Sequence, residues 1–352
     1  MLRRAPALAL AALTVLSVAA LAPTPAQARL IRPQVTRPVV PPKASFWERV
    51  QSPHIDEIRR LVDEAIYLRG AVATQYWDQY LLPTRRRVLR DALERYEKAL
   101  ALDPRRLDLR LDAAHTALEA GEYERAVGHY LAYREKTGEN ALLVTYDLAE
   151  SYARLGRWSD TIDELEPVAD DPSNYERARF LTLLGQGYMA RGRLDDAIDA
   201  LERSVVAFPQ QYGSTDQLAL ALLAVAYDRD EQLGRAHEMI DQLRAIDPQF
   251  YVLVQQQPVM AQTAPSQRSY IVYGPPSERH YVLGLFYEAQ GRTADAAASW
   301  RAYLDSAEPG FARRAQQHLV AAEKQLAAAK NARVPARAMP STPALPPMGV
   351  RP

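Results

Sequence analysis

Hydrophobic residues in the body of this chain recur at intervals of three and four, the spacing that places them on one face of an α-helix. The first such run covers Pro53–Tyr80 and predicts one long amphipathic helix, which Pro83 ends. The last run covers Phe311–Ala329 and predicts a terminal helix. Between them the runs are shorter and come in pairs separated by a short polar turn, which predicts a series of helix hairpins.

These pairs share a set of residue types at matching places. The first helix carries a small residue followed by a tyrosine, a glycine opens the turn, and an alanine followed by a large apolar residue starts the second helix. One copy contains Leu184, Gly185, Tyr188, Gly192, Ala197, Leu201 and Pro209. Another contains Leu283, Gly284, Tyr287, Gly291, Ala296, Trp300 and Pro309. The recurrence indicates one structural unit used several times.

The spacing of the shared positions supports the repeat independently of any one residue. The turn glycines Gly121, Gly156 and Gly192 recur about every 35 residues. The small residues of the second helices, Ala126, Thr161, Ala197 and Ala236, keep nearly the same step. A weaker copy, with Ala92, Tyr96, Ala99 and Pro104, precedes them. The small residues allow two helices to approach closely, and proline closes a unit because it does not continue a helix.

In these positions the chain resembles tetratricopeptide repeats. The resemblance implies an all-α fold, in which antiparallel helix hairpins stack into a right-handed superhelical solenoid with a concave groove. We expect the repeat domain to cover residues 46–330, with a signal peptide at 1–28, a disordered proline-rich linker at 29–45 and a disordered tail at 331–352. The expected hairpins cover about 84–104, 105–138, 140–172, 173–209, 214–248 and 277–309, followed by a terminal helix at 311–329. The long helix before them is expected to cap the array.

An insert at residues 249–276 interrupts the repeat between the last two hairpins. It is rich in tyrosine and glutamine and contains Pro258, Pro265, Pro275 and Pro276. Two interpretations remain open. The insert is either a structural detour or a loop that reaches into the groove.

The first 28 residues have the three parts of an export signal. Arg3 and Arg4 precede the apolar stretch Ala7–Leu21, and Ala26-Gln27-Ala28 forms a small-x-small cleavage site. The apolar stretch is shorter than the roughly 20 residues that span a bilayer. We therefore expect cleavage and a periplasmic or secreted protein with no integral membrane span, the alternative being an uncleaved anchor.

Charge is distributed unevenly although the formal net charge is +0. No acidic residue precedes Glu48 or follows Glu323, so an acidic body lies between two basic, proline-containing ends. The balanced total does not favour nucleic acid as a partner. Arg85, Arg86, Arg87 and Arg90 form one dense basic cluster, interpreted either as a patch for phosphate or an acidic partner or as a solvated helix start.

Little in the sequence suggests catalysis. The 352 residues contain no cysteine, which excludes disulfides and thiolate chemistry, and the 6 histidines do not occur at metal-ligand spacing. There is no phosphate-binding glycine loop and no nucleophile elbow. We expect no cofactor, no metal and no enzymatic activity.

The resemblance also implies which residues face the groove, because the first helix of each hairpin lines it. The corresponding positions here are Asp108, His115, Tyr146, Glu150, Arg154, Arg179, Gln186, Asp228, Arg229, Glu278, Tyr281 and Glu288. Family members that dock chaperones hold a C-terminal carboxylate with a Lys/Asn/Arg clamp. The matching positions in this chain offer Tyr, Glu, Thr and Gln, which does not favour that ligand.

Three hypotheses for function follow. The first is a non-catalytic scaffold or adaptor of the cell envelope that binds one or more envelope proteins or peptides in the groove. The second is a tethering protein whose basic ends bind anionic envelope polymer. The third is an envelope polysaccharide or peptidoglycan enzyme, or its accessory subunit, and it ranks last because the insert is short for a catalytic module.

Overall fold

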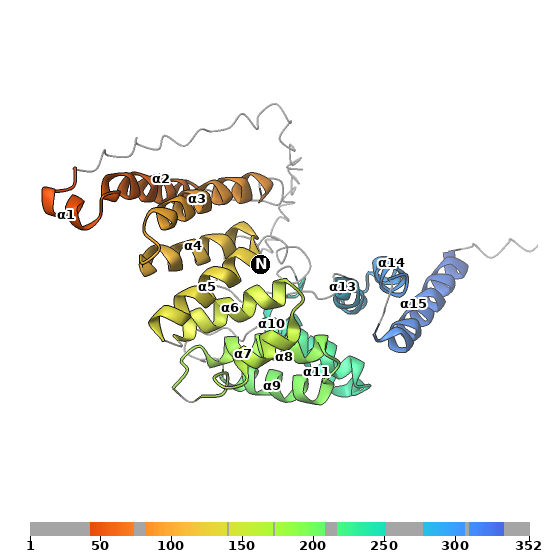
Figure 1. Ribbon diagram of the computed structural model, residues 1–352. Helices are drawn as coiled ribbons and strands as arrows, with labels where there is room; N and C mark the ends of the chain where they lie inside the picture. The colour runs from red at the N-terminus through yellow and green to blue at the C-terminus, as the bar shows by residue number, and fades with distance from the viewer. Residues whose placement is uncertain are drawn as a thin grey trace, which may run out of the picture. The chain divides into compact units, whose positions relative to one another are not determined.

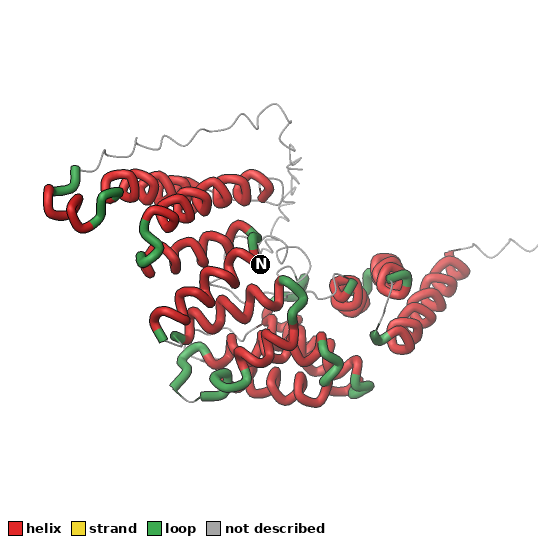
Figure 2. The backbone as a smooth tube through the Cα atoms, viewed as in Figure 1, coloured by secondary structure: helices red, strands yellow, loops and turns green. Residues whose placement is uncertain are grey.

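The computed structural model describes residues 43–73, 82–138, 141–171, 173–207, 217–250, 277–306 and 310–333, and these consist of helices and turns (Figures 1 and 2). The helices are α1 (Phe46–Gln51), α2 (Ile55–Ala73), α3 (Leu82–Leu102), α4 (Leu107–Ala120), α5 (Tyr123–Thr137), α6 (Leu142–Arg154), α7 (Trp158–Leu165), α8 (Arg177–Ala190), α9 (Leu194–Ala207), α10 (Gln217–Arg229), α11 (Leu233–Ile246), α13 (Glu278–Ala289), α14 (Thr293–Leu304) and α15 (Ala312–Arg333). None of the described helices is long and apolar enough to cross a membrane.

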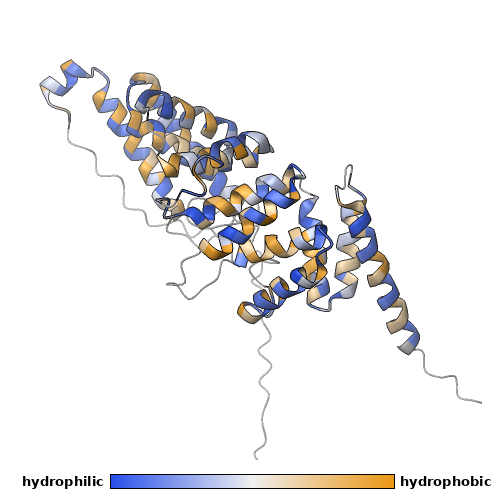
Figure 3. Cartoon of the chain, turned by 90° about the horizontal axis from the view of Figure 1, so that it is seen from below, coloured by the Kyte–Doolittle hydropathy of each residue, from blue (hydrophilic) through white to orange (hydrophobic). Residues whose placement is uncertain are grey.

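Successive helices pack against each other in chain order. The hairpins are α2 with α3, α4 with α5, α6 with α7, α8 with α9, α10 with α11, and α13 with α14. Most hairpins also pack on the next one, and α15 packs on α14. Each helix carries both hydrophobic and hydrophilic residues (Figure 3), so its apolar side must be covered by a neighbour. The predicted all-α fold of stacked antiparallel hairpins is confirmed.

The turn glycines adopt the backbone conformation that makes them necessary. Gly121, Gly156, Gly192 and Gly291 have φ between +71° and +81°, a left-handed region in which a Cβ atom clashes with the backbone. The hairpin of α10 and α11 has Glu231 at φ 60° in this turn instead of glycine. Its helices still pair, which shows that one strained turn residue does not prevent the hairpin from forming.

The small residues in the helices mark the points of closest approach. A Cβ atom added to Gly284 of α13 would lie 2.6 Å from a ring carbon of Trp300 in α14. Ala126, Ala197 and Ala296 are fully buried at their crossings. Thr161 replaces alanine in the third hairpin, and its hydroxyl oxygen lies 3.2 Å from the carbonyl oxygens of both Ala149 and Arg157, within reach to donate to either. The extra polar group is therefore satisfied within the crossing.

Several predicted segments are described only in part. The helix expected over Pro53–Tyr80 is observed as α2 up to Ala73, and residues 74–81 lie outside the described residues. The segment 84–104, predicted as a hairpin, contains one helix, α3, which pairs with α2. The terminal helix extends to Arg333 rather than Ala329.

The segments predicted as a signal peptide, as a linker up to residue 42 and as a tail beyond residue 333 lie outside the described residues, as does most of the predicted insert. Of the insert, Gln249 and Phe250 are described. The ring of Phe250 is buried, with its centroid 5.2 Å from that of Phe286 in α13. This contact fixes the start of the insert against the last hairpin.

Candidate partner-binding surface

The residues predicted to line the groove all lie on the first helices of hairpins, α4, α6, α8, α10 and α13. They divide by exposure. Asp108 is exposed, and His115, Arg154, Arg179, Glu278 and Glu288 are partly exposed, whereas the others are buried, namely Tyr146, Glu150, Gln186, Asp228, Arg229 and Tyr281. The outward orientation expected for the second set is not observed. Several of these side chains interact with side chains of neighbouring helices, as described below.

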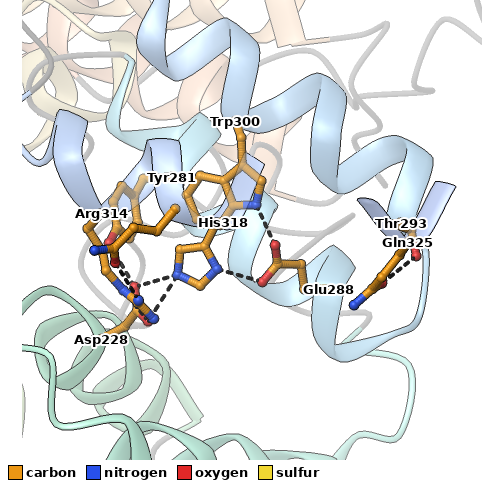
Figure 4. A network of polar contacts seen from close by, with 9 residues as sticks. Asp228, Tyr281, Glu288, Thr293, Trp300, Arg314, His318 and Gln325 are labelled. Carbon is orange, nitrogen blue, oxygen red and sulfur yellow. Dashed lines mark hydrogen bonds and ion pairs between the residues drawn. The ribbon is translucent and has the colours of Figure 1, made fainter. Parts of the chain in front are cut away.

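One group of polar contacts centres on the carboxylate of Asp228 at the end of α10 (Figure 4). Tyr281 of α13 donates its hydroxyl to Asp228 Oδ2 at 2.7 Å. Arg314 of α15 donates to Oδ1 at 2.6 Å from Nη2 and 3.1 Å from Nε, and His318 Nε2 lies 3.1 Å from both oxygens. One buried carboxylate thus joins α10, α13 and α15.

His318 extends this network to the last hairpin. Its Nδ1 lies 2.8 Å from Glu288 Oε2, and Trp300 Nε1 donates to the other oxygen of Glu288 at 2.8 Å. The imidazole also stacks on the Trp300 indole, with ring centroids 4.6 Å apart and planes 13° from parallel. The ring is therefore held on both nitrogens and on one face.

The protonation of this network follows from its contacts. Burial disfavours charge on Asp228, but the hydrogen bonds from His318 and Arg314 outweigh it and lower the pKa of Asp228 to about 2. Burial also disfavours charge on His318, but its bonds to Asp228 and Glu288 prevail and raise the pKa of His318 to about 9. At neutral pH the pair is ionised, and both His318 nitrogens donate.

A third cation, Arg229, reinforces the same contact between α10 and the last hairpin. Arg229 forms an ion pair with Glu278, and its guanidinium carbon lies 4.4 Å from the ring centroids of both Tyr281 and Phe311. Four of the predicted groove residues, Asp228, Arg229, Glu278 and Tyr281, therefore hold the last hairpin and α15 in place. Each of these side chains makes a polar contact with another side chain of the chain.

A pocket of about 320 Å³ lies beside this network and is lined by α10, α11, α13 and α15. Both α11 and α13 line it, and these two described helices do not pack closely on each other. Its lining includes the apolar Ile240 and Leu285 and charged residues of both signs. The mixed charges single out no class of ligand.

A different cluster lies on α6 and its neighbours. Tyr130 of α5 donates its hydroxyl to Asp147 Oδ2 at 3.0 Å, and His115 Nε2 of α4 lies 3.3 Å from the same oxygen. Glu150 follows one turn later on α6 and is 1% exposed. Burial raises the pKa of Glu150 to about 8, because Arg154 offsets only part of the cost of desolvation.

The cations around Glu150 have other partners as well. Arg154 Nε lies 3.8 Å from Glu150 Oε1, and the Arg154 guanidinium lies 5.8 Å from the ring centroid of Tyr123. Arg179 of α8 donates to Glu176 at 3.0 Å and lies over the ring of Tyr146, 3.9 Å from its centroid. Residues from α4, α5, α6 and α8 therefore meet around two buried carboxylates.

The remaining candidates have simpler surroundings. Asp108 pairs with Arg106 at the start of α4, and Gln186 Nε2 lies 3.5 Å from the carbonyl of Thr182. In the basic cluster, Arg85 is buried and donates to Glu119 at 3.1 Å, while Arg90 Nε lies 2.8 Å from Glu122. Two of the four arginines thus bind acidic residues of the next hairpin.

Three important residues were not among the predicted candidates. Asp147 lies one position away from the groove positions of the repeat, so the repeat pattern did not select it. Arg314 and His318 lie on α15, outside the repeats, where no pattern shows which side of the helix faces α10. Their spacing of four residues, which places two basic groups on one helix face, was the only signal available.

Comparison with known proteins agrees with the helix pairing. Residues 89–143 match the tetratricopeptide repeat family. The matched segment covers most of α3, all of α4 and α5, and the start of α6. No curated protein matches the chain.

Solved structures that resemble the chain include a tetratricopeptide repeat protein from Parabacteroides merdae, 16% identical with a TM-score of 0.41, covering 78% of this chain and 97% of that one. MamA is 20% identical with a TM-score of 0.39, covering 48% of this chain and 94% of that one. The C-terminal part of a repeat protein from Cytophaga hutchinsonii is 13% identical with a TM-score of 0.37, covering 77% of this chain and 98% of that one.

Proposed function

We propose that this chain is a non-catalytic adaptor of the cell envelope that binds a partner protein or peptide on the first helices of its hairpins. The observation that carries the proposal is the cluster around α6. There His115, Glu150 and Arg179, from three successive hairpins, lie close to the buried rings of Tyr130 and Tyr146, and His115 and Arg179 are partly exposed. Charged groups beside aromatic anchors suit a peptide ligand.

The repeat match supports a binding role, because stacked hairpins present side chains from several units to one ligand. The envelope location rests on the export signal in residues 1–28. Replacing Leu16, in the middle of the apolar stretch, by arginine tests that part. Export of a reporter fused after residue 45 should be lost, and unchanged export would refute the envelope assignment.

Site-specific photocrosslinking tests the binding surface. A photoreactive amino acid at Leu111 of α4 or Met189 of α8, both partly exposed on first helices, should capture a partner in the cells that produce the protein. The matched control is Val206, which is 82% exposed on α9, the second helix of its hairpin. Capture from Val206 at the same yield, or no capture from the first helices, would contradict the proposal.

The uneven charge favours a second candidate function, in which the basic ends bind anionic envelope polymer. Such binding is electrostatic and should weaken as the salt concentration rises. At 0.1 M salt, the attraction between exposed charges is largely screened beyond about 10 Å, and this distance shortens at higher salt. Deleting residues 334–352 should remove salt-sensitive envelope binding and leave partner capture at Leu111 intact. If envelope retention does not respond to salt or to this deletion, the tethering function is refuted.

A further inference from the structure

Three carboxylate oxygens on α6 have no hydrogen-bond partner among the described residues although they are buried. They are Oδ1 of Asp147 and both oxygens of Glu150, on side chains whose residues are 0% and 1% exposed. Buried carboxylate oxygens in proteins are nearly always hydrogen-bonded, because losing water without a replacement is costly. Each of these three oxygens would therefore be expected to accept a hydrogen bond, and none does from the described residues.

The surrounding side chains do not supply these donors. Tyr130 and His115 face the other oxygen of Asp147. Arg154, on α6 itself, stays 3.8 Å from Glu150, beyond hydrogen-bond length. Arg179, a cation from α8, is bonded to Glu176 and stacked on Tyr146, and it makes no hydrogen bond to these oxygens. The three oxygens therefore suit a hydrogen-bond donor that comes from outside the described residues.

We propose that Asp147 and Glu150 form the binding site for a lysine or arginine side chain of the partner. This inference rests on the proposed function, since Asp147 and Glu150 lie on α6, one of the first helices of the proposed binding region. A basic side chain carries only donors, three on an ammonium and five on a guanidinium, and a positive charge opposite to that of the carboxylates. Its long aliphatic stem reaches a buried group while the peptide backbone stays outside.

The charge of the whole molecule favours the same class of ligand. All acidic residues lie between Glu48 and Glu323, so the helical body carries the negative charge of the chain. A negative body attracts basic partners before contact and makes like-charged ones unfavourable. The buried pair then provides the specific contact at one position of the peptide.

Selection of peptides on the purified full-length chain tests the assignment. Seven-residue peptides displayed on phage should be enriched for lysine or arginine at one position. Replacing that residue by norleucine, or Glu150→Gln in the protein, should each weaken binding roughly 30-fold or more. The control Glu124→Gln, on an exposed glutamate of α5, should leave affinity unchanged. Thermal unfolding of each variant confirms that the comparison is made on folded protein.

Proton release distinguishes direct contact from a structural effect. Glu150, with its pKa raised to about 8, is mostly protonated at pH 7 and must ionise to accept a cation. Calorimetry in buffers of different ionisation enthalpy should detect up to one proton released per bound basic peptide at pH 7, little at pH 9.5, and none in Glu150→Gln. Affinity should rise with pH between 6 and 8.

The outcomes separate this inference from the proposed function. Peptides that bind the first helices without basic enrichment, and equally well to Glu150→Gln, would overturn the basic-residue site and leave the adaptor function standing. Peptides that crosslink only at Val206 would overturn the adaptor function, and the site with it.

Discussion

The network around Asp228 should determine whether the last hairpin and α15 stay attached to the preceding repeats. We consider Asp228→Asn, which keeps the shape of the side chain and removes its charge. Arg314 and His318, with side chains 15% and 11% exposed, would then lack their anion. Breaking a buried charge pair from one side typically costs about 3–5 kcal/mol, which sets the upper range of the effect.

The shifted pKa values of Asp228 and His318 indicate how much free energy of unfolding the network contributes. The pKa of Asp228 falls from 3.8 to about 2, which corresponds to about 2 kcal/mol at 1.36 kcal/mol per unit. The pKa of His318 rises from 6.5 to about 9, which corresponds to about 3 kcal/mol. The second value is larger because His318 also binds Glu288, so the two describe overlapping contacts and do not add. We expect Asp228→Asn to cost about 2–4 kcal/mol.

The direction of the pH dependence follows from the sign of each shift. Asp228 contributes stability that is present above pH 4 and is lost as pH falls toward about 2. His318 contributes stability that is present below pH 6.5 and is lost as pH rises through about 9. The network should therefore be strongest between about pH 4 and 6.5, and Asp228→Asn should flatten both sides of this profile.

Urea unfolding and amide hydrogen exchange measure these effects. Because repeat hairpins are stabilised mainly by their neighbours, faster exchange should appear in α13, α14 and α15 and leave α4 and α5 unchanged. Asp241→Asn is the control, since this aspartate pairs with Arg244 on the surface and its side chain is 69% exposed. A loss below about 1 kcal/mol, or faster exchange spread evenly over all hairpins, would refute the reasoning.

Three further predictions concern single positions. Gly284→Ala should destabilise the last hairpin by about 1–3 kcal/mol, because the new Cβ meets the Trp300 ring. Gly70→Ala, whose Cβ meets no described atom within 4 Å apart from the backbone of its own helix, should stabilise the protein by about 0.5–1 kcal/mol. Thermal unfolding would contradict this reasoning if both variants shifted the melting temperature in the same direction. Glu231→Gly should stabilise by about 1 kcal/mol by relieving the positive φ, and a lower midpoint in urea would show that no strain is present. Glu150→Gln should stabilise the free protein by about 1–2 kcal/mol at pH 9.5, where the wild-type carboxyl is charged, and have less effect at pH 6, where it is neutral; an equal effect at both pH values would argue against a desolvated carboxylate.

The repeat positions were predictable because they depend on local geometry. A turn with positive φ requires glycine at Gly121 and Gly192, and a close helix crossing requires a small residue such as Ala126 or Gly284. These constraints recur at a fixed period, so the hairpins and their order could be inferred from the amino-acid sequence alone.

The role of the groove residues was less predictable. The repeat pattern placed Tyr281 and Asp228 on first helices, and they lie there. It did not show that Tyr281 is fully buried and bonded to Asp228 rather than exposed to a ligand. That outcome depends on α15, whose Arg314 and His318 bind Asp228 from a segment about 90 residues away.

The amino-acid sequence by itself therefore determined the helices, the turns and the pairing of neighbours, because each of these depends on residues close together in the chain. Only the tertiary structure decided which charges neutralise each other and which buried oxygens lack a donor among the described residues. Asp228 accepts hydrogen bonds from four donor atoms on three other side chains. Glu150, on an equivalent first helix, accepts none from the described residues. The physical reason is that desolvation and ion pairing depend on every side chain within a few ångströms, and these come from distant parts of the sequence.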